Sequence, residues 1–116
     1  MNSLDELRVR LDALAASARV GRVPGWAGSV AIDVDGVQWV TCFVDPAGVR
    51  SRPSATSAVT VIHARSADAV RRWLIDGVDY THLVQSGEFE IDGTYFDVLL
   101  LSKVLGLRPD RKVMAT

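Results

Sequence analysis

Three side chains in this sequence could support acid–base or nucleophilic chemistry: His63, His82 and Cys42. An imidazole titrates near neutral pH and can act as a general base, and a thiolate can act as a nucleophile. Neither histidine has a nucleophile or a second metal ligand at a recognisable spacing, and a lone cysteine is more often a small buried hydrophobe. We therefore predict no catalytic residue and no metal site, and we expect no cofactor.

Charged and glycine-rich stretches give equally little support for a phosphate or nucleic-acid site. The glycines between positions 21 and 28 lack the lysine and the preceding strand of a phosphate-binding loop. Arg50, Arg52 and Arg65 could meet an anionic headgroup, but scattered loop arginines are more often solvated. The formal net charge is −1, from 13 basic and 14 acidic residues, which predicts no nucleic-acid partner.

The composition is that of one folded domain. The chain has 116 residues, of which 48% are hydrophobic and 23% charged. We expect a single domain over residues 1–109 and a flexible tail over 110–116. The single cysteine, the charged N-terminal segment and the short apolar runs predict a cytoplasmic protein without stable membrane insertion.

Hydrophobic periodicity indicates which elements position these residues. A stripe at helical spacing predicts a first helix, which either packs on the domain's own sheet or forms a dimer seam; its members are Leu4, Leu7, Leu11, Leu14 and Ala18. Alternating residues predict strands over 28–34, 37–44 and 58–64, with 50–57 a loop or a weak edge strand. Ser66 and Asp79 each suit the start of a helix, and a strand follows over 86–93.

That order of elements predicts an α+β fold. We expect a sheet of about five strands, antiparallel or mixed, with helices packed on one face. The last helix, from Tyr95 to Leu105, is unusually apolar. Its polar side chains beyond Tyr95 are Asp97, Ser102 and Lys103, and at about 100° per residue they share no single face. Such a helix must be covered on several sides by core, ligand or partner.

The stretch from Gly77 to Leu107 has a distinctive order of glycines, polar residues and apolar residues. Its marks are Gly77, Asp79, Ser86-Gly87, Phe89, Ile91, Gly93 and the leucine-rich run over 98–105. In this it resembles the sterol-carrier-protein-2 (SCP-2) family of lipid-transfer domains, although Tyr80, Val84 and Glu88 stand where many members carry Pro, Phe and Lys. The resemblance implies an apolar cavity between sheet and helices for a fatty acid, an acyl-CoA or a sterol-like lipid.

The predicted function is therefore a carrier or sequestering protein for a hydrophobic small molecule. Its predicted ligand-binding residues are Trp39, Phe43, Val61, Trp73, Leu83, Val84, Phe89, Ile91, Phe96, Leu100 and Val104. One alternative is an isomerase or cyclase that uses the same cavity, with His63, Asp97 or Tyr95 as acid or base. Another is an interaction or dimerisation module, and the chain could be a monomer or a homodimer.

Overall fold

The computed structural model describes residues 3–18, 26–53, 58 and 60–107. The helices are α1 (Ser3–Ala16), α2 (Ala67–Leu74), α3 (Tyr80–Gln85) and α4 (Tyr95–Leu105). The strands are β1 (Gly28–Val34), β2 (Val37–Asp45), β3 (Gly48–Pro53), β4 (Thr60–Ala64) and β5 (Phe89–Asp92). The tail expected over residues 110–116 lies outside the described residues.

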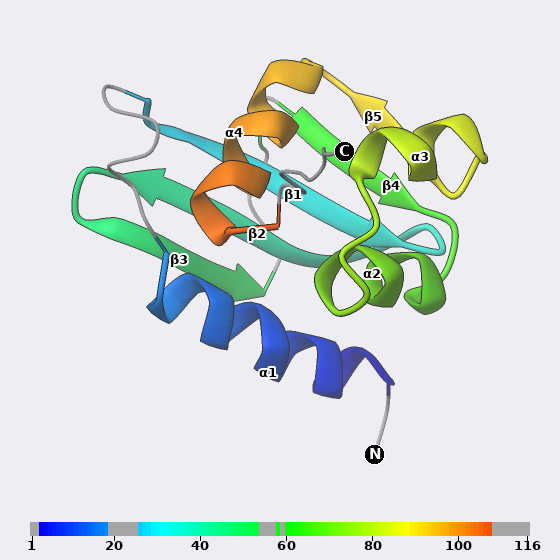
Figure 1. Ribbon diagram of the computed structural model, residues 1–116, viewed down its shortest axis with the longest axis horizontal. Helices are drawn as coiled ribbons and strands as arrows, with labels where there is room; N and C mark the ends of the chain where they lie inside the picture. Colours follow the sequence, from blue (N-terminus) through cyan, green and yellow to red (C-terminus); the bar gives the residue numbers. More distant parts are fainter. Residues whose placement is uncertain (1–2, 19–25, 54–57, 59, 108–116) are drawn as a thin grey trace, which may run out of the picture.

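The strands form one mixed five-stranded sheet in the order β3-β2-β1-β4-β5 (Figure 1). β1 pairs antiparallel with β2 and parallel with β4, so Val30 lies opposite Cys42 on one side and Thr60 on the other. The outer pairs, β2 with β3 and β4 with β5, are antiparallel. The prediction of an α+β fold with a sheet of about five strands is confirmed, and the sheet is mixed, the arrangement that the prediction allowed beside a purely antiparallel one.

Turn residues explain the hairpin geometry. Asp35 and Gly36 join β1 to β2 and have φ angles of 52° and 80°, the positive values that a tight hairpin turn requires. The ladder shifts register between Ile32 and Asp33, which marks a β-bulge in this pair. β3 is an edge strand, because it pairs with β2 on one side only. It includes residues 50–53, for which the polar sequence allowed either a loop or a weak edge strand.

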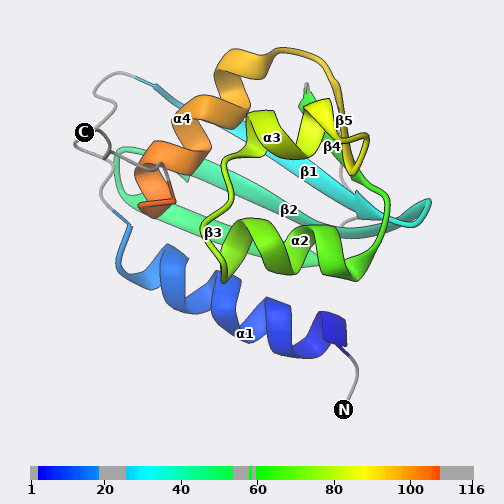
Figure 2. The same ribbon diagram turned by 45° about the vertical axis from the view of Figure 1, so that its right-hand side comes forward.

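The helices cover one face of the sheet, and the core lies between them (Figure 2). α1 contacts β3 and α2, with Leu7 and Leu11 almost completely buried. The apolar stripe of α1 therefore packs on the domain's own sheet and neighbouring helix. α2 contributes Val70, Trp73 and Leu74 to the same core.

α4 is covered on more than one side, which explains its apolar sequence. Val98, Leu101 and Leu105 enter the main core. Leu100 and Val104 form a second cluster on another side of the helix, against Ala18, Trp26 and Val49. The helix begins at the cap Thr94, whose side chain accepts a hydrogen bond from Phe96 N, and ends at Gly106 with a φ of 76°.

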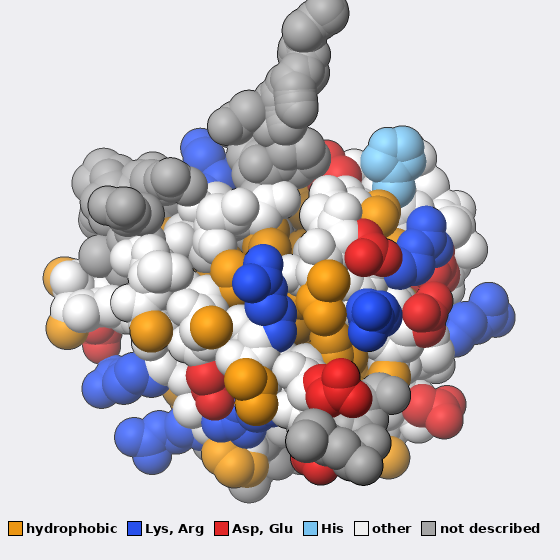
Figure 3. Space-filling view, turned by 60° about the horizontal axis from the view of Figure 1, so that its bottom comes forward, with side chains coloured by type: hydrophobic (Ala, Val, Ile, Leu, Met, Phe, Trp, Pro, Cys, Tyr) orange, Lys and Arg blue, Asp and Glu red, His pale blue; other side chains and the backbone are white. Residues whose placement is uncertain are grey.

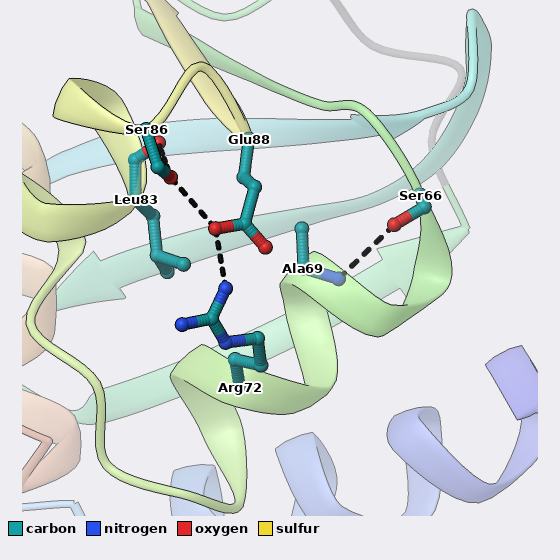
Figure 4. Close-up of polar contacts among 6 residues, drawn as sticks. All are labelled: Ser66, Ala69, Arg72, Leu83, Ser86 and Glu88. Atoms are coloured by element: carbon teal, nitrogen blue, oxygen red, sulfur yellow. Dashed lines mark hydrogen bonds and ion pairs between the residues drawn. The ribbon is translucent and has the colours of Figure 1, made fainter.

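A polar network ties α2 to the end of α3 and to the residue before β5 (Figure 4). The Arg72 guanidinium forms an ion pair with Glu88 Oε2. The same oxygen accepts a hydrogen bond from Ser86 Oγ at 2.6 Å, and Ser86 Oγ also lies 3.1 Å from the carbonyl oxygen of Leu83. At the start of α2, Ser66 Oγ accepts a hydrogen bond from Ala69 N. These contacts fix the positions of α2 and α3, which form part of the cavity described next.

Candidate functional site

A cavity of about 210 Å³, partly open to solvent, lies among α2, the start of α3 and α4. Its wall consists of Trp73, Asp79, Tyr80, Thr81, Leu99, Ser102 and Leu107. Large apolar side chains and a few polar groups share this wall, the usual composition of a small-molecule site. Its volume is below the ~300–1,000 Å³ of typical sites for drug-sized ligands. The cavity therefore suits a short hydrophobe or one end of a longer molecule.

Ser102 is the most unusual residue of this wall. It is 3% exposed, and its Oγ finds no hydrogen-bond partner among the described residues. A helical serine can bond the carbonyl four residues earlier, but Ser102 lacks that bond as well. A buried hydroxyl without a partner costs about 1–3 kcal/mol. The hydrogen-bonding capacity of this hydroxyl is therefore unused among the described residues.

Asp79 gives the wall its negative charge. Its Oδ1 accepts a hydrogen bond from Thr81 N at 3.1 Å, so the carboxylate also caps α3. Burial, followed by the nearby Asp79 and Tyr95, raises the pKa of the Tyr80 phenol above its ordinary value. Tyr80 is therefore a neutral hydrogen-bond donor at physiological pH.

Trp73 is the one predicted ligand-binding residue that lines this cavity in the described part of the chain. It is 1% exposed and packs edge-to-face on Phe89, with the ring centroids 5.7 Å apart and the planes at 82°. Phe89 and Leu83 lie in the main core, and Val84 and Ile91 pack against its margin. None of these four predicted residues lines the cavity, and Phe89 contacts its wall residue Trp73.

Leu100 and Val104 lie in the smaller cluster of α4, with Trp26. They belong to the same helix as Leu99 and Ser102 but to another of its sides. α4 thus has a protein-covered side, which holds the predicted Leu100 and Val104, and a cavity side, which holds Leu99 and Ser102; this is a division within one helix. Sequence periodicity gave no sign of this division, because the helix is apolar on both sides.

Three predicted residues do not lie between sheet and helices. Side chains alternate between the two faces of a strand, so Phe43 and Val61, which neighbour the core residues Cys42 and Ile62, point to the opposite face. Phe96 is 61% exposed, because it lies roughly 200° around α4 from the buried Val98. These three residues lie away from the wall of this cavity.

Trp39 occupies an intermediate position. It follows Gln38, which pairs with Asp33 beyond the β-bulge, and precedes Val40, which pairs with Ile32 before it. The regular alternation is interrupted there, and Trp39 packs against the margin of the main core. It lies outside the cavity wall.

Six wall residues are absent from the predicted ligand-binding set: Asp79, Tyr80, Thr81, Leu99, Ser102 and Leu107. One signal was present, since Ser102 is a polar residue in an otherwise apolar segment of α4. Asp79 was identified only as a helix cap, a role that it has. Asp79, Tyr80, Thr81 and Leu107 come from helix ends and the chain beside them, whose arrangement is not encoded by a hydrophobic period.

The residues considered as acid or base lie elsewhere. His63 is on the outer sheet face, with Nδ1 3.0 Å from Asp33 Oδ2. Asp97 Oδ2 accepts a hydrogen bond from Thr60 Oγ1 at 2.8 Å, and Tyr95 is 49% exposed. These residues are not part of the cavity wall in the described ranges.

Cys42 is completely buried in the core. Burial raises the pKa of its thiol to about 12, so the reactive thiolate is scarce at neutral pH. His82, the other histidine of the sequence, is exposed in α3. No group of His, Cys, Asp and Glu that could hold a metal ion occurs in the described residues.

A second, smaller cavity of about 120 Å³ lies between α1 and α2. Glu6, Leu7, Ala67, Asp68 and Arg71 line it, so most of its polar surface is charged. On the face that carries α1, hydrophobic atoms appear only in small areas between charged and polar side chains (Figure 3). This cavity is a weaker candidate for a hydrophobic ligand than the one beside α4. The helices of the described ranges are all too short or too polar to cross a membrane.

No protein-family model and no curated protein matches this chain. Solved structures do match. The sterol carrier protein 2 of Aedes aegypti, determined in complex with the C16 fatty acid palmitate, aligns with a TM-score of 0.63 and 12% identity, over 94% of this chain and 99% of that one. UbiJ-SCP2, a ubiquinone synthesis protein, aligns with a TM-score of 0.58 and 21% identity, over 82% and 79%.

The stereoselective inverting sec-alkylsulfatase Pisa1 from Pseudomonas aligns with a TM-score of 0.66 and 12% identity, over 87% of this chain. This chain spans only 16% of that larger protein. At these identities the comparisons establish the fold, and they agree with the resemblance seen in Gly77–Leu107. The chain has the SCP-2-like fold.

Proposed function

We propose that this chain binds a hydrophobic small molecule in the cavity among α2, α3 and α4, and acts as a carrier or sequestering protein. The observation that carries the proposal is the cavity itself, where Trp73, Leu99 and Leu107 offer apolar surface beside an apolar helix. The Aedes protein of the same fold was determined with a bound fatty acid. Burial of the ligand's apolar surface would supply the binding free energy, at roughly 25 cal/mol per Å².

The fatty acid, acyl-CoA and sterol-like lipid classes are all consistent with an apolar wall. A volume of about 210 Å³ suits one end of such a molecule. The remainder of the lipid would extend across the open side of the cavity, or the cavity would widen to hold it. We place this function in the cytoplasm, because the single buried thiol of Cys42 suits a reducing compartment.

The test uses delipidated protein and thermal unfolding. A ligand at a hundred times its Kd stabilises the folded state by about 2.7 kcal/mol, which raises Tm by roughly 10 °C for a chain of this size. A fatty acid, a fatty alcohol and a sterol are each added, and native mass spectrometry of the protein as purified shows whether a lipid is already bound. Absence of a shift with all three, together with a ligand-free mass, would refute the proposal.

A pair of variants locates the site. Leu99→Phe adds volume to the cavity wall and should abolish the ligand-induced shift, since Leu99 lines the cavity. Val9→Phe makes a similar addition on the outer surface of α1, where Val9 is 69% exposed, and should leave the shift intact. An unchanged shift in Leu99→Phe would mean that the ligand binds elsewhere.

A further inference from the structure

Thr60, the first residue of β4, is a polar side chain that is completely buried. Its Oγ1 donates a hydrogen bond to Asp97 Oδ2 at 2.8 Å and accepts one from Thr94 N at 3.1 Å. Both partners belong to the start of α4, where Thr94 is the N-cap. One buried hydroxyl therefore joins an inner strand of the sheet to the first turn of a helix that lines the cavity.

The start of α4 has the sequence of a capping box, Thr94 followed three residues later by Asp97. In a capping box the N-cap side chain bonds a backbone N–H of the first turn, and the acidic side chain bonds the N–H of the N-cap. Thr94 Oγ1 makes the first of these bonds, with Phe96 N. The Thr94 N–H goes instead to Thr60 Oγ1, and Asp97 accepts from the same hydroxyl. A contact that is usually local to a helix is here made with the sheet.

This anchor lies on the side of α4 that is turned away from the cavity. At about 100° per residue, Leu101 lies roughly 40° around the helix from Asp97, whereas Leu99 lies roughly 200° around it. Leu101 is fully buried in the main core, and Leu99 lines the cavity. The bond between Asp97 and Thr60 therefore holds the Leu101 side against the core and leaves the Leu99 side to the cavity.

Apolar packing alone gives α4 little preference for this rotation. Leu99, Leu100 and Leu101 are consecutive, so turning the helix by about 100° would replace one leucine at the core by another. The apolar area buried, and hence the hydrophobic free energy, would change little. The same turn would separate Asp97 from Thr60 and deprive a fully buried hydroxyl of its acceptor, which is unfavourable. A buried polar contact can in this way select one arrangement among several with similar apolar burial.

We propose that Thr60 is a positioning residue of the cavity: its hydroxyl fixes the rotation of α4 about the helix axis and so determines which side of α4 forms the cavity wall. Without this anchor α4 would adopt several rotations, and the wall at Leu99 would be formed only part of the time. The effect on ligand binding rests on the proposed function, whereas the effect on α4 holds whether or not a ligand binds.

Thiol labelling of a Val104→Cys variant reports the rotation of α4. Val104 is 1% exposed and lies about two turns beyond Asp97, so fraying of the first turn does not reach it. Cys42 is completely buried and is labelled only when the core opens, which makes it the internal reference. Thr60→Val removes the hydroxyl and should raise the labelling rate at position 104 about fivefold or more relative to Cys42, because a helix that samples several rotations exposes each side for part of the time. Thr60→Ser keeps the hydroxyl and should keep the original ratio.

Two further variants separate the rotation of α4 from a general weakening of the helix. Thr94→Ala removes the N-cap side chain but keeps the N–H that bonds Thr60, so it should lower Tm and leave the labelling ratio unchanged. Asp97→Ala removes the acceptor of the Thr60 hydroxyl and should raise the ratio as Thr60→Val does, and it carries the test if Thr60→Val does not fold. An unchanged ratio in Asp97→Ala and in folded Thr60→Val would overturn this inference.

Ligand binding supplies the second readout, with palmitate, 1-hexadecanol and cholesterol as probes. If α4 forms the wall only a third of the time, the apparent Kd of a probe that binds the unmodified protein rises about threefold. We expect a rise of this size or more in Thr60→Val and none in Thr60→Ser. A loss of global stability that leaves the molecules folded would not change Kd.

The two readouts distinguish the possible failures. A raised labelling ratio with an unchanged Kd would overturn the role of Thr60 in the cavity, because the ligand would then bind elsewhere. If none of the three probes bound the unmodified protein, the proposed function would fail, and the labelling ratio would still decide whether Thr60 fixes the rotation of α4.

Discussion

Glu88 shows how a single side chain makes stability depend on pH. Hydrogen bonds from Ser86 and Arg72 lower the pKa of its carboxyl group. A carboxylate with a lowered folded-state pKa stabilises the fold above the unfolded-state value of about 4.3, and this contribution disappears as the pH falls through the folded-state pKa. The stabilising effect of Glu88 should therefore be complete at neutral pH and should vanish in acid.

Glu88→Gln tests this expectation. The variant should be less stable than the unmodified protein at pH 7, and the difference should shrink once the pH drops below about 4. Urea unfolding across pH 3–7 measures it. Glu90→Gln, at an exposed position of β5, is the matched control and should show no such trend. A difference that is constant over the whole range would contradict the role of the charged form.

α1 shows how an element is fixed by one of its faces. Leu11 is fully buried, whereas Val9, two residues earlier, is 69% exposed. Leu11→Ala should lower the free energy of unfolding by about 2–5 kcal/mol, because it leaves a cavity in the core. Val9→Ala should change it by less than ~0.5 kcal/mol.

Denaturant unfolding together with light scattering measures both effects. A Leu11→Ala protein that kept its stability and changed only its molecular mass would indicate that this face of α1 is a dimer seam. The opposite result, a large loss of stability at constant mass, is expected from the contact of α1 with β3 and α2.

At the level of elements, the sequence predicted most of the fold for physical reasons. β1 alternates towards Asp35-Gly36, and β2 follows as a run rich in β-branched and aromatic residues on both faces, so composition and turn identify the two strands together. β3 was uncertain, because an edge strand with polar side chains is stabilised mainly by its backbone ladder with β2. The parallel pairing of β1 with β4 was left open, because a period of two gives no strand direction.

The cavity was less predictable than the fold. A hydrophobic residue at a buried position looks the same in sequence whether it contacts protein or ligand, so Trp73 was predicted together with Leu83 and Phe89. The sequence could not show that the Leu99 side of α4 meets the cavity while the Leu100 side is covered by protein. That difference depends on Trp26 and Ala18 covering one side.

At the level of the whole molecule, the apolar character of α4 now has an explanation. The side of α4 that faces the main core and the side that faces Trp26 are both covered by protein. The remaining side, with Leu99 and Ser102, meets the cavity. Core packing therefore accounts for most of the apolar residues of this helix. The cavity accounts for the side that protein atoms leave partly open.

The parallel contact between β1 and β4 has a consequence for the order of folding. The hairpins β1–β2 and β2–β3 join neighbours in the chain, but β1 meets β4 only after both hairpins have been passed. Contacts between distant parts of a chain slow folding, because loop closure must come before the contact forms. The joining of β1 and β4 should therefore limit the folding rate.

Ile62 lies opposite Ile32 in that parallel pair and is fully buried. Ile62→Val should destabilise the protein by about 0.5–1.5 kcal/mol and should act mainly by slowing refolding. Val49→Ala, in the edge strand β3, should instead mainly speed unfolding. Stopped-flow refolding and unfolding of the two variants measures this difference, and a normal refolding rate for Ile62→Val would place the rate-limiting step elsewhere. If Ile62→Val refolds slowly, as expected, β1 and β4 join in the rate-limiting step, and the helices of the cavity find a complete sheet only after that step.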